Sequence, residues 1–235
     1  NSGETSASST LSLARITLLR EKGLDSASTI SVKDAISDLE INGSIVEPCP
    51  DASKRLQLRY KQPPRLTPYQ ACLRRSAPQK MNSMRLAKHS NKIRRKLKSL
   101  IKACKSSNRR GVTLCAEERK PLKTKKRDVV VLDPSKPSHT LTTLPDDLVH
   151  YEEPRILTVR EYARLQSFPD WFVFCGKYTT GGEMRKKECP RYTQVGNAVA
   201  PFVAEALGIA LDSLAKTLSK STPTTKRQSP KIVAV

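Results

Sequence analysis

The segment from Thr158 to Pro169 constrains the fold of this chain more than any other. Thr158-Val-Arg-Glu161 is a capping box, in which the threonine hydroxyl and the glutamate carboxylate satisfy the first free amides of a helix. Pro169 cannot continue a helix, so the pattern predicts a helix that ends near Ser167. Arg160 and Arg164 are four residues apart, which taken alone indicates a solvated helix face.

A second block is a glycine turn that leads into an apolar helix. Gln194-Val-Gly-Asn-Ala-Val199 is followed by Pro201 and by the apolar run from Ala204 to Leu211. We expect Gly196 to adopt unusual backbone angles and Asn197 to cap the helix. A turn of this kind can also present amides and a carboxamide to a polar ligand. The residues alone leave both interpretations open.

Both blocks, in this order, resemble the last two conserved motifs of the DNA cytosine-5-methyltransferases. The string Leu-Thr-Val-Arg-Glu-Tyr-Ala-Arg-Leu-Gln-Ser-Phe-Pro-Asp, which ends at Asp170, is similar to the ninth motif, which organises the small domain that holds the target-recognition region. The second block resembles the tenth motif, although many members have proline at the position of Ala200. The resemblance implies that S-adenosylmethionine is the cofactor and that the turn contacts it through Asn197, Ala198 and Val199.

The resemblance extends upstream of these motifs. The stretch from Pro134 to Thr143 is similar to the family segment before the ninth motif, which implies that Thr140 contacts the DNA backbone with Thr142 beside it on one strand face. Hydroxyls suit phosphate oxygens, yet threonine is also a good strand former. The segment Lys33–Leu39 resembles the family element that follows the eighth motif.

A basic segment lies where the variable target-recognition region belongs by this resemblance. From Arg85 to Arg110 the chain carries 11 basic residues and no acidic one. One helical stripe is apolar and consists of Ile93, Leu97, Leu100 and Ile101. We predict an amphipathic helix that contacts duplex DNA through Arg94, Arg95 and Lys98. A solvated face over a packed stripe fits the pattern equally well.

The family's chemistry needs residues that this sequence does not contain. A cysteine thiolate adds to C6 of a flipped-out cytosine, and C5 then takes the sulfonium methyl group. The family supplies this with Pro-Cys-Gln, Glu-Asn-Val and Arg-x-Arg segments and a glycine-rich cofactor loop, none of which is present. Pro48-Cys49-Pro50 lacks the following glutamine and comes after the Lys33–Leu39 segment, whereas the family nucleophile precedes it. No catalytic residue is therefore predicted here.

Composition indicates a polyanionic partner and no metal. The net charge of +21 favours nucleic acid. Six cysteines are scattered without a C-x-x-C pair, which predicts free thiols in a reducing cytoplasm and no zinc site. No run of about 18 apolar residues suggests a membrane span, and the amino end has no signal-peptide pattern. Asn1 in place of methionine hints at a longer reading frame.

The predicted architecture is α/β, as the C-terminal portion of a Rossmann-like methyltransferase with a mixed, partly irregular small domain. Residues 1–30 are expected to be a flexible lead with a short helix at 11–22, and 31–154 the target-recognition region. Within it we expect a helix at 31–39, irregular structure at 43–80 with a helical turn near 67–74, and strands at 129–132 and 139–143. Residues 155–215 would hold the last two motifs, and 216–235 a disordered basic tail.

Three functional hypotheses follow from the sequence. The chain is expected to be part of a bacterial-type DNA cytosine-5-methyltransferase of a restriction-modification system, inactive without an N-terminal catalytic portion. It could instead be one subunit of a split methyltransferase, or a non-catalytic DNA-binding remnant. A remnant would bind duplex DNA and ignore S-adenosylmethionine.

Overall fold

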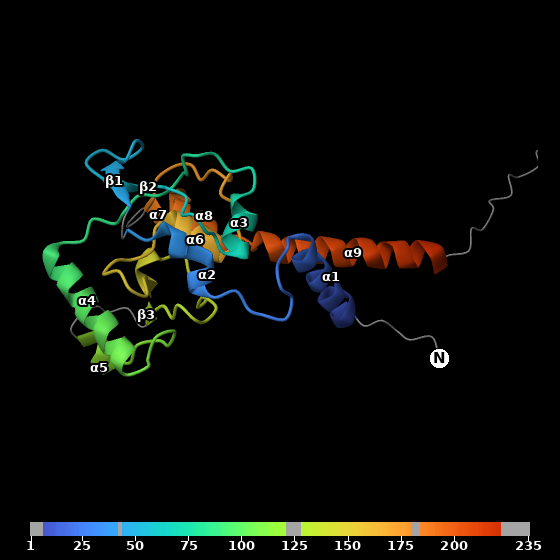
Figure 1. Ribbon diagram of the computed structural model, residues 1–235, viewed down its shortest axis with the longest axis horizontal. Helices are drawn as coiled ribbons and strands as arrows, with labels where there is room; N and C mark the ends of the chain where they lie inside the picture. Colours follow the sequence, from blue (N-terminus) through green and yellow to red (C-terminus); the bar gives the residue numbers. More distant parts are fainter. Residues whose placement is uncertain (1–6, 42–43, 121–127, 180–183, 222–235) are drawn as a thin grey trace, which may run out of the picture.

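A computed structural model describes residues 7–41, 44–120, 128–179 and 184–221. Figure 1 shows a mixed body from which one long helix extends, with a shorter helix beside it. The longer helices are α1 (Ala7–Glu21), α3 (Pro68–Arg74), α4 (Asn91–Ser106), α6 (Val159–Leu165), α8 (Arg191–Asn197) and α9 (Pro201–Ser221). The short helical turns are α2 (Val32–Ile36), η1 (Ser37–Leu39), α5 (Ala116–Arg119), η3 (Pro145–Asp147) and α7 (Met184–Lys187). The strands are β1 (Ile45–Pro48), β2 (Leu56–Arg59), β3 (Val130–Val131) and β4 (Leu148–Val149).

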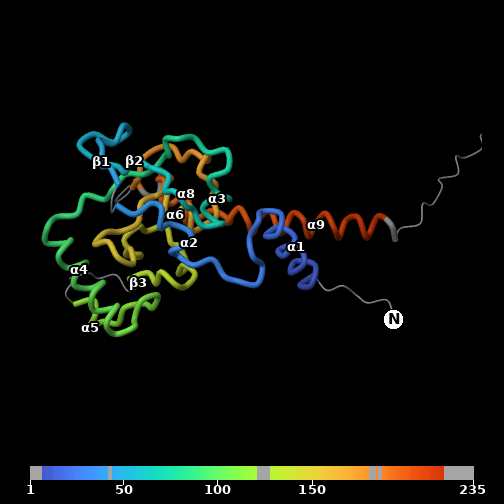
Figure 2. Tube along the Cα trace, viewed as in Figure 1, coloured from blue at the N-terminus to red at the C-terminus, as the bar shows by residue number. Residues whose placement is uncertain are grey.

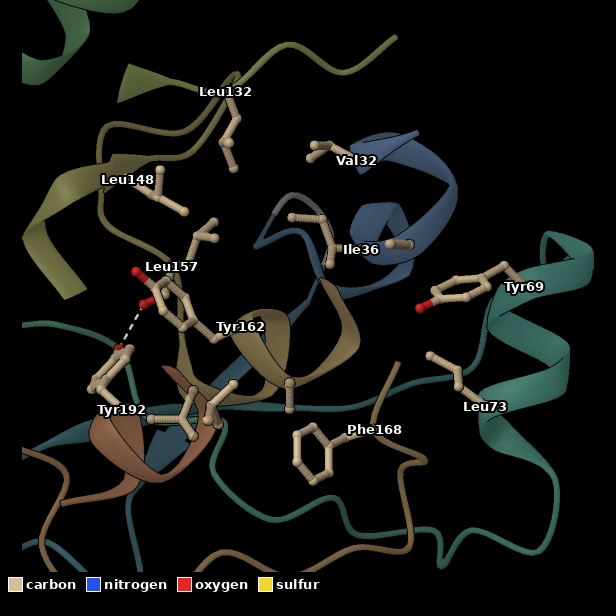
Figure 3. Close-up of a cluster of buried hydrophobic side chains, with 14 of the residues drawn as sticks. Val32, Ile36, Tyr69, Leu73, Leu132, Leu148, Leu157, Tyr162, Phe168 and Tyr192 are labelled. Atoms are coloured by element: carbon tan, nitrogen blue, oxygen red, sulfur yellow. Dashed lines mark hydrogen bonds between the residues drawn. The ribbon is translucent and has the colours of Figure 1, made fainter. Parts of the chain in front are cut away.

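The main core surrounds α6, as Figure 3 shows. Tyr162 is fully buried, and its ring meets the ring of Tyr192 from α8 edge-on at 5.4 Å between centroids. The Tyr192 hydroxyl donates to the carbonyl of Leu157 at 2.6 Å, which satisfies a phenol in an otherwise apolar setting. Helices α2 and α3 pack on the other side through Ile36 and Leu73. Helix α6, which carries the capping box Thr158–Glu161, therefore lies at the centre of the main core.

A β-hairpin occupies part of the stretch that was expected to be irregular. Strands β1 and β2 pair antiparallel, with Val46 opposite Leu58. Residues 84–86, which follow α3, pair with β2 as a third segment. The amide of Leu58 donates to the Met84 carbonyl at 3.1 Å, and the amide of Leu86 donates to the Leu56 carbonyl at 2.8 Å. Pro48 is tolerated because β1 is an edge strand. The expected helical turn near 67–74 is confirmed as α3, with Thr67 as its cap.

The second sheet is a short parallel pair. The strand expected at 129–132 is present as β3, which pairs with β4. The strand expected at 139–143 is not formed. The Thr142 hydroxyl donates to Asp147 at 2.6 Å and accepts the amide of Leu144 at 3.0 Å, so a side chain competes with strand pairing there.

Helices α1 and α9 pack against each other beside the body (Figure 1). Lys22 forms an ion pair with Glu205 at 2.8 Å, where the two helices meet. The helix predicted at 11–22 is present as α1, and it starts earlier, at Ala7, inside the expected flexible lead. Helix α9 continues to Ser221, so the first residues of the expected disordered tail are helical, and Lys216 pairs with Asp212 at 2.6 Å. Residues 222–235 lie outside the described part of the chain.

Helix α4 packs through a separate apolar cluster. Its buried stripe is Leu97, Leu100, Ile101 and Cys104, which contact Leu114, Val129, Val131 and Val149. The predicted amphipathic basic helix is confirmed, although Ile93 is 37% exposed and lies outside the stripe. Figure 2 shows that α4 lies at the end of the molecule opposite to α9.

Candidate cofactor and nucleic-acid site

Both arginines of α6 are buried, and they donate hydrogen bonds to carboxylates or backbone carbonyls inside the body. Arg164 is 0% exposed and forms a bidentate pair with Asp170 at 2.7 Å for each bond. It also donates to both carboxylate oxygens of Asp38, at 2.9 and 3.1 Å. The solvated face that the spacing of the two arginines alone would indicate is therefore not formed. A guanidinium with five donors can be buried when carboxylates take most of them.

Arg160 is also 0% exposed and is held in a different way. It donates to the carbonyls of Asn82 at 3.0 Å, Pro169 at 3.3 Å and Phe172 at 2.7 Å. Burial lowers the pKa of Arg160 to about 10, and Asp170 opposes that shift. This arginine thereby connects the turn after α6 to the segment that follows α3.

The predicted capping box at the start of α6 is confirmed and is extended by a third residue. Thr158 accepts the amide of Glu161, and Glu161 accepts the amide of Thr158 at 2.6 Å. Arg155 donates two bonds to Glu161, both 2.7 Å long. Burial alone would raise the pKa of Glu161, but its pairing with Arg155 holds that pKa below the usual range. The entry to α6 is therefore an ion-paired and fully buried junction.

His150 is buried beside this junction and gives the chain a pH-dependent stability. Its Nδ1 accepts the amides of Glu152 and Glu153, so the neutral ring carries its proton on Nε2. Burial lowers the pKa of His150 to about 3, with Arg155 adding to the shift. The unfolded chain, with an ordinary histidine pKa of about 6.5, binds a proton that the folded chain rejects, so the stability present above pH 6.5 is lost as the pH falls.

We predict that His150 alone costs about 2 kcal/mol of unfolding free energy between pH 7 and pH 5. In His150→Gln the carboxamide oxygen can still accept the two amides, so this variant should lose about that much less on acidification. Urea unfolding at both pH values measures the difference. His139→Gln is the matched control, because His139 is exposed. An equal acid sensitivity of His150→Gln and the unsubstituted chain would contradict the prediction.

The turn between α8 and α9 differs from its prediction in two ways. Asn197 is the last residue of α8 and does not cap α9, which begins at Pro201. Gly196 is helical, and its φ is not in the left-handed region. It is needed for close approach instead: a Cβ there would lie 2.4 Å from the Thr142 carbonyl oxygen and 2.8 Å from its carbon.

The three residues predicted to bind the cofactor are adjacent and reachable. Asn197 is exposed, Ala198 is half-buried and Val199 is 65% exposed. Through Gly196 the segment that carries Thr140 and Thr142 packs directly behind this turn. Thr140 is exposed, whereas Thr142 is half-buried and its hydroxyl is engaged by Asp147. The structure thus brings together the residues predicted to bind cofactor and those predicted to contact the DNA backbone.

The basic residues of α4 form a second, separate group. Arg94, Arg95 and Lys98 are all exposed and lie outside the buried stripe of α4. They lie at the end of the body away from α9. A contact surface for DNA phosphates at that end is compatible with their exposure.

Cys49 is held as a structural thiol. It is 7% exposed and donates to Asp51 at 3.0 Å, and burial raises the pKa of its thiol. A nucleophilic cysteine needs the thiolate, which this setting disfavours. Among the described residues there is no group of three or more His, Cys, Asp or Glu side chains that could hold a metal ion.

Comparison with known proteins decides the family. The family model described as C-5 cytosine-specific DNA methylase matches residues 39–213, which is well over half of the chain. The chain belongs to the C-5 cytosine-specific DNA methylase family. The match includes the hairpin, α4, α6 and the α8–α9 turn, so the resemblance inferred from the last two motifs is confirmed.

Relatives of this methylase-family chain occur in plants and bacteria. It is 49% identical over 76 residues to DNA (cytosine-5)-methyltransferase CMT2 of Arabidopsis thaliana, which covers 31% of the chain and 5% of that protein. It is 40% identical over 95 residues to type II methyltransferase M1.HphI of Haemophilus parahaemolyticus, covering 40% and 23%. It is 44% identical over 82 residues to type II methyltransferase M.AquIB of Picosynechococcus, a match that covers 34% of this chain and 59% of that protein. The chain therefore spans less than two thirds of each of these relatives.

A solved structure shares the fold. The chain superimposes with a TM-score of 0.50 on a crystal structure described as an E. coli prophage DNA modification methyltransferase. The sequences are 23% identical, and the match covers 80% of this chain and 48% of the other. The mixed helix and sheet arrangement is thus one found in a methyltransferase.

Helix α9 has a second property that the sequence prediction missed. By length and composition alone the segment 191–219, which spans α8 and most of α9, would suffice to cross a membrane, and most of its apolar window is uncovered. The family model matches this segment up to residue 213, so most of it lies within the methylase-family region.

Proposed function

We propose that this chain is the C-terminal portion of a DNA cytosine-5-methyltransferase that transfers methyl from S-adenosylmethionine to C5 of cytosine in duplex DNA. The observation that carries this proposal is the turn Asn197–Val199, which is exposed and packed through Gly196 on the segment of Thr140 and Thr142. The residues proposed to bind the cofactor and those proposed to contact the DNA backbone therefore lie on two segments that pack against each other. A cytoplasmic location and the absence of a membrane span belong to the same proposal.

The cofactor would meet the chain at this turn. Asn197 offers a carboxamide that can both donate and accept, and Val199 offers exposed apolar surface beside it. S-adenosylmethionine would supply the electrophilic methyl group. This chain's residues would form part of the wall that orients it, while the nucleophile, the Glu-Asn-Val segment and the glycine-rich loop would come from an N-terminal portion.

An exposed apolar stripe on α9 supports the proposal that an N-terminal catalytic portion packs against this chain. Val203, Leu207 and Leu211 are spaced by four residues and form one apolar stripe, exposed by 54%, 42% and 66%. The stripe begins beside Val199, at the proposed cofactor wall. In the whole enzyme it would pack on the Rossmann-like sheet of the catalytic portion.

Leu211→Gln tests this stripe. We expect the variant to change the unfolding free energy of the chain alone by less than about 0.5 kcal/mol, because the side chain is largely exposed. We expect it to weaken association with the catalytic portion of a relative. Urea unfolding and a pull-down with purified portions measure the two effects, with Ser213→Gln as the control on the same helix. Undiminished association would remove the stripe from the proposed interface.

Residues 31–154 would provide target recognition and residues 155–215 the ninth and tenth motifs. Within the first range, Arg94, Arg95 and Lys98 would contact DNA from the exposed surface of α4, with Arg95 and Lys98 on phosphates. Each phosphate contact that is lost should reduce the salt dependence of DNA binding by about one counterion.

A reconstitution experiment tests the function itself. The chain is mixed with an N-terminal portion that carries the missing segments, and transfer of labelled methyl from S-adenosylmethionine to duplex DNA is measured. We expect no transfer by either part alone, transfer by the mixture, and a loss with Asn197→Ala. Methyl transfer by the isolated chain would overturn our account of the missing nucleophile.

One comparison favours a split methyltransferase as the second candidate. The 82 matched residues make up 59% of M.AquIB, so that relative is only about 140 residues long in all. Chains of this family region therefore occur without the length of a complete enzyme. If the mixture stays inactive and the chain binds DNA without responding to S-adenosylmethionine, the non-catalytic DNA-binding remnant is the correct description.

A further inference from the structure

The β1–β2 hairpin has an apolar face that is only half covered. Because side chains alternate along a strand, Val46, Leu56 and Leu58 lie on one face of the hairpin. Leu58 is buried in a cluster with Leu39, Met81 and Met84. Val46 and Leu56, on the same face, are 40% and 53% exposed. The apolar face therefore continues beyond its cover.

A groove of about 470 Å³ lies over this uncovered part. Val46, Leu56 and Leu86 line it with apolar surface, and His89, just before α4, and Arg94, in the first turn of α4, line it as well. Figure 1 shows the hairpin and α4 at the same end of the molecule, and the chain that leads into α4 bridges to the hairpin at Gln57 and Arg85. The groove thus combines elements that are 30 or more residues apart in the sequence.

Arg94 and His89 give the groove hydrogen-bond donors. Arg94 is exposed, and no acidic residue occurs between Arg85 and Arg110. His89 Nε2 accepts the amide of Ile156 at 3.3 Å, and burial lowers the pKa of His89, so the neutral ring carries its proton on Nδ1. Glu153 also lines the groove, but it is occupied by the Ile41 amide at 2.6 Å and by Arg155 at 2.6 Å.

Donors beside apolar surface, without a free carboxylate, fit one class of partner best. In the major groove guanine presents two acceptors, O6 and N7, and pyrimidines present apolar surface at their 5-position. The major groove also admits a two-stranded β-ribbon or an α-helix, and the chain offers both at this end. The excess of basic residues on α4 suits the phosphates on either side.

We propose that this groove reads base pairs, with the β1–β2 hairpin in the major groove of duplex DNA, Arg94 and His89 donating to a guanine, and Val46 and Leu56 against a neighbouring pyrimidine. The inference rests on the proposed function, in which duplex DNA is the substrate, and adds to it the surface that selects the sequence.

Selection of bound duplexes from a random pool by the 235-residue chain tests the proposal. The affinity for the enriched duplex is then compared with that for a scrambled one at fixed salt. We expect a guanine-containing site, and a loss of about 10-fold or more in the preference for it with Leu56→Gln and with Arg94→Gln. Both side chains are exposed, and thermal unfolding of each variant verifies that it folds.

Each variant has a matched control on its own element. Ile45→Gln changes an equally exposed apolar residue, 54% against 53%, on the opposite face of the hairpin. Lys98→Gln removes an exposed positive charge from α4 outside the groove. We expect Ile45→Gln to keep the preference and Lys98→Gln to weaken both duplexes alike.

Two results would overturn the inference, and they differ in what they leave standing. If the chain binds DNA but shows no preference, or if the variants and their controls behave alike, the groove does not read bases, while duplex DNA remains the proposed substrate. If the chain binds no duplex even at low salt, DNA contact by this chain fails and the groove inference fails with it.

Discussion

Arg164→Met is expected to lower the free energy of unfolding by about 3–5 kcal/mol, because breaking a buried ion pair leaves uncompensated charge. Both carboxylates that Arg164 pairs with are buried, with side chains 1% exposed for Asp38 and 0% for Asp170. Arg74 also pairs with Asp170, at 3.5 Å, and would offset only part of the lost charge. For a domain of this size the change corresponds to a fall of about 10 °C in Tm.

The matched control is Arg95→Met, which removes an exposed arginine and should change stability by less than about 0.5 kcal/mol. The triple variant that also carries Asp38→Asn and Asp170→Asn should recover part of the loss, because neutral amides cost less to bury than unpaired carboxylates. Equal melting temperatures for Arg164→Met and the unsubstituted chain would show that the network does not hold the core. Urea and thermal unfolding provide both quantities.

Gly196→Ala is expected to destabilise the chain by about 1–3 kcal/mol through overpacking, although alanine is the better helix former. Its Cβ would meet the Thr142 carbonyl at 2.4 Å and the Thr143 Cα at 3.0 Å, and these are backbone atoms that cannot rotate away. The loop of Thr140 and Thr142 would have to move off α8. Activity reconstituted with an N-terminal portion should therefore fall more than stability alone explains.

Gly208→Ala is the matched control, since a Cβ at that position of α9 meets nothing within 4 Å. It should stabilise the chain by about 0.5–1 kcal/mol, because alanine lowers the entropy of the unfolded state and favours the helix. The two variants are therefore expected to change stability in opposite directions in the same urea experiment. A stabilised Gly196→Ala would mean that the contact with Thr142 relaxes at no cost.

Local patterns in the sequence predicted local structure well. The capping box of Thr158 and Glu161 and the buried stripe of α4 depend on residues three or four apart, and both are present. The burial of Arg164 depends on Asp38, which is 126 residues away in the chain, so the helix pattern alone could not predict it. Asp170 was within the same motif and was the one signal that the arginine had a nearby partner.

Other misses have the same physical origin. The prolines between residues 48 and 68 hid the hairpin, whose edge strand tolerates Pro48. The reason for Gly196 lies in a contact with Thr142, 54 residues earlier, and not in its own backbone angles. The roles of Asn197, Ala198 and Val199, and of Arg94, Arg95 and Lys98, stay predictions, because they concern ligands.

The separate apolar cluster of α4 has a consequence for how such chains diversify. The ion-pair network of Arg164 and the core around α6 contain no side chain of α4. Helix α4 contacts the rest of the molecule chiefly through the outward faces of β3 and β4, by way of Val131 and Val149. Replacing this helix by the corresponding helix of a relative would therefore disturb only the small apolar cluster of α4, and the core around α6 and the Arg164 network would stay intact. New sequence preferences could then arise by transplantation, without renewed selection for a stable body.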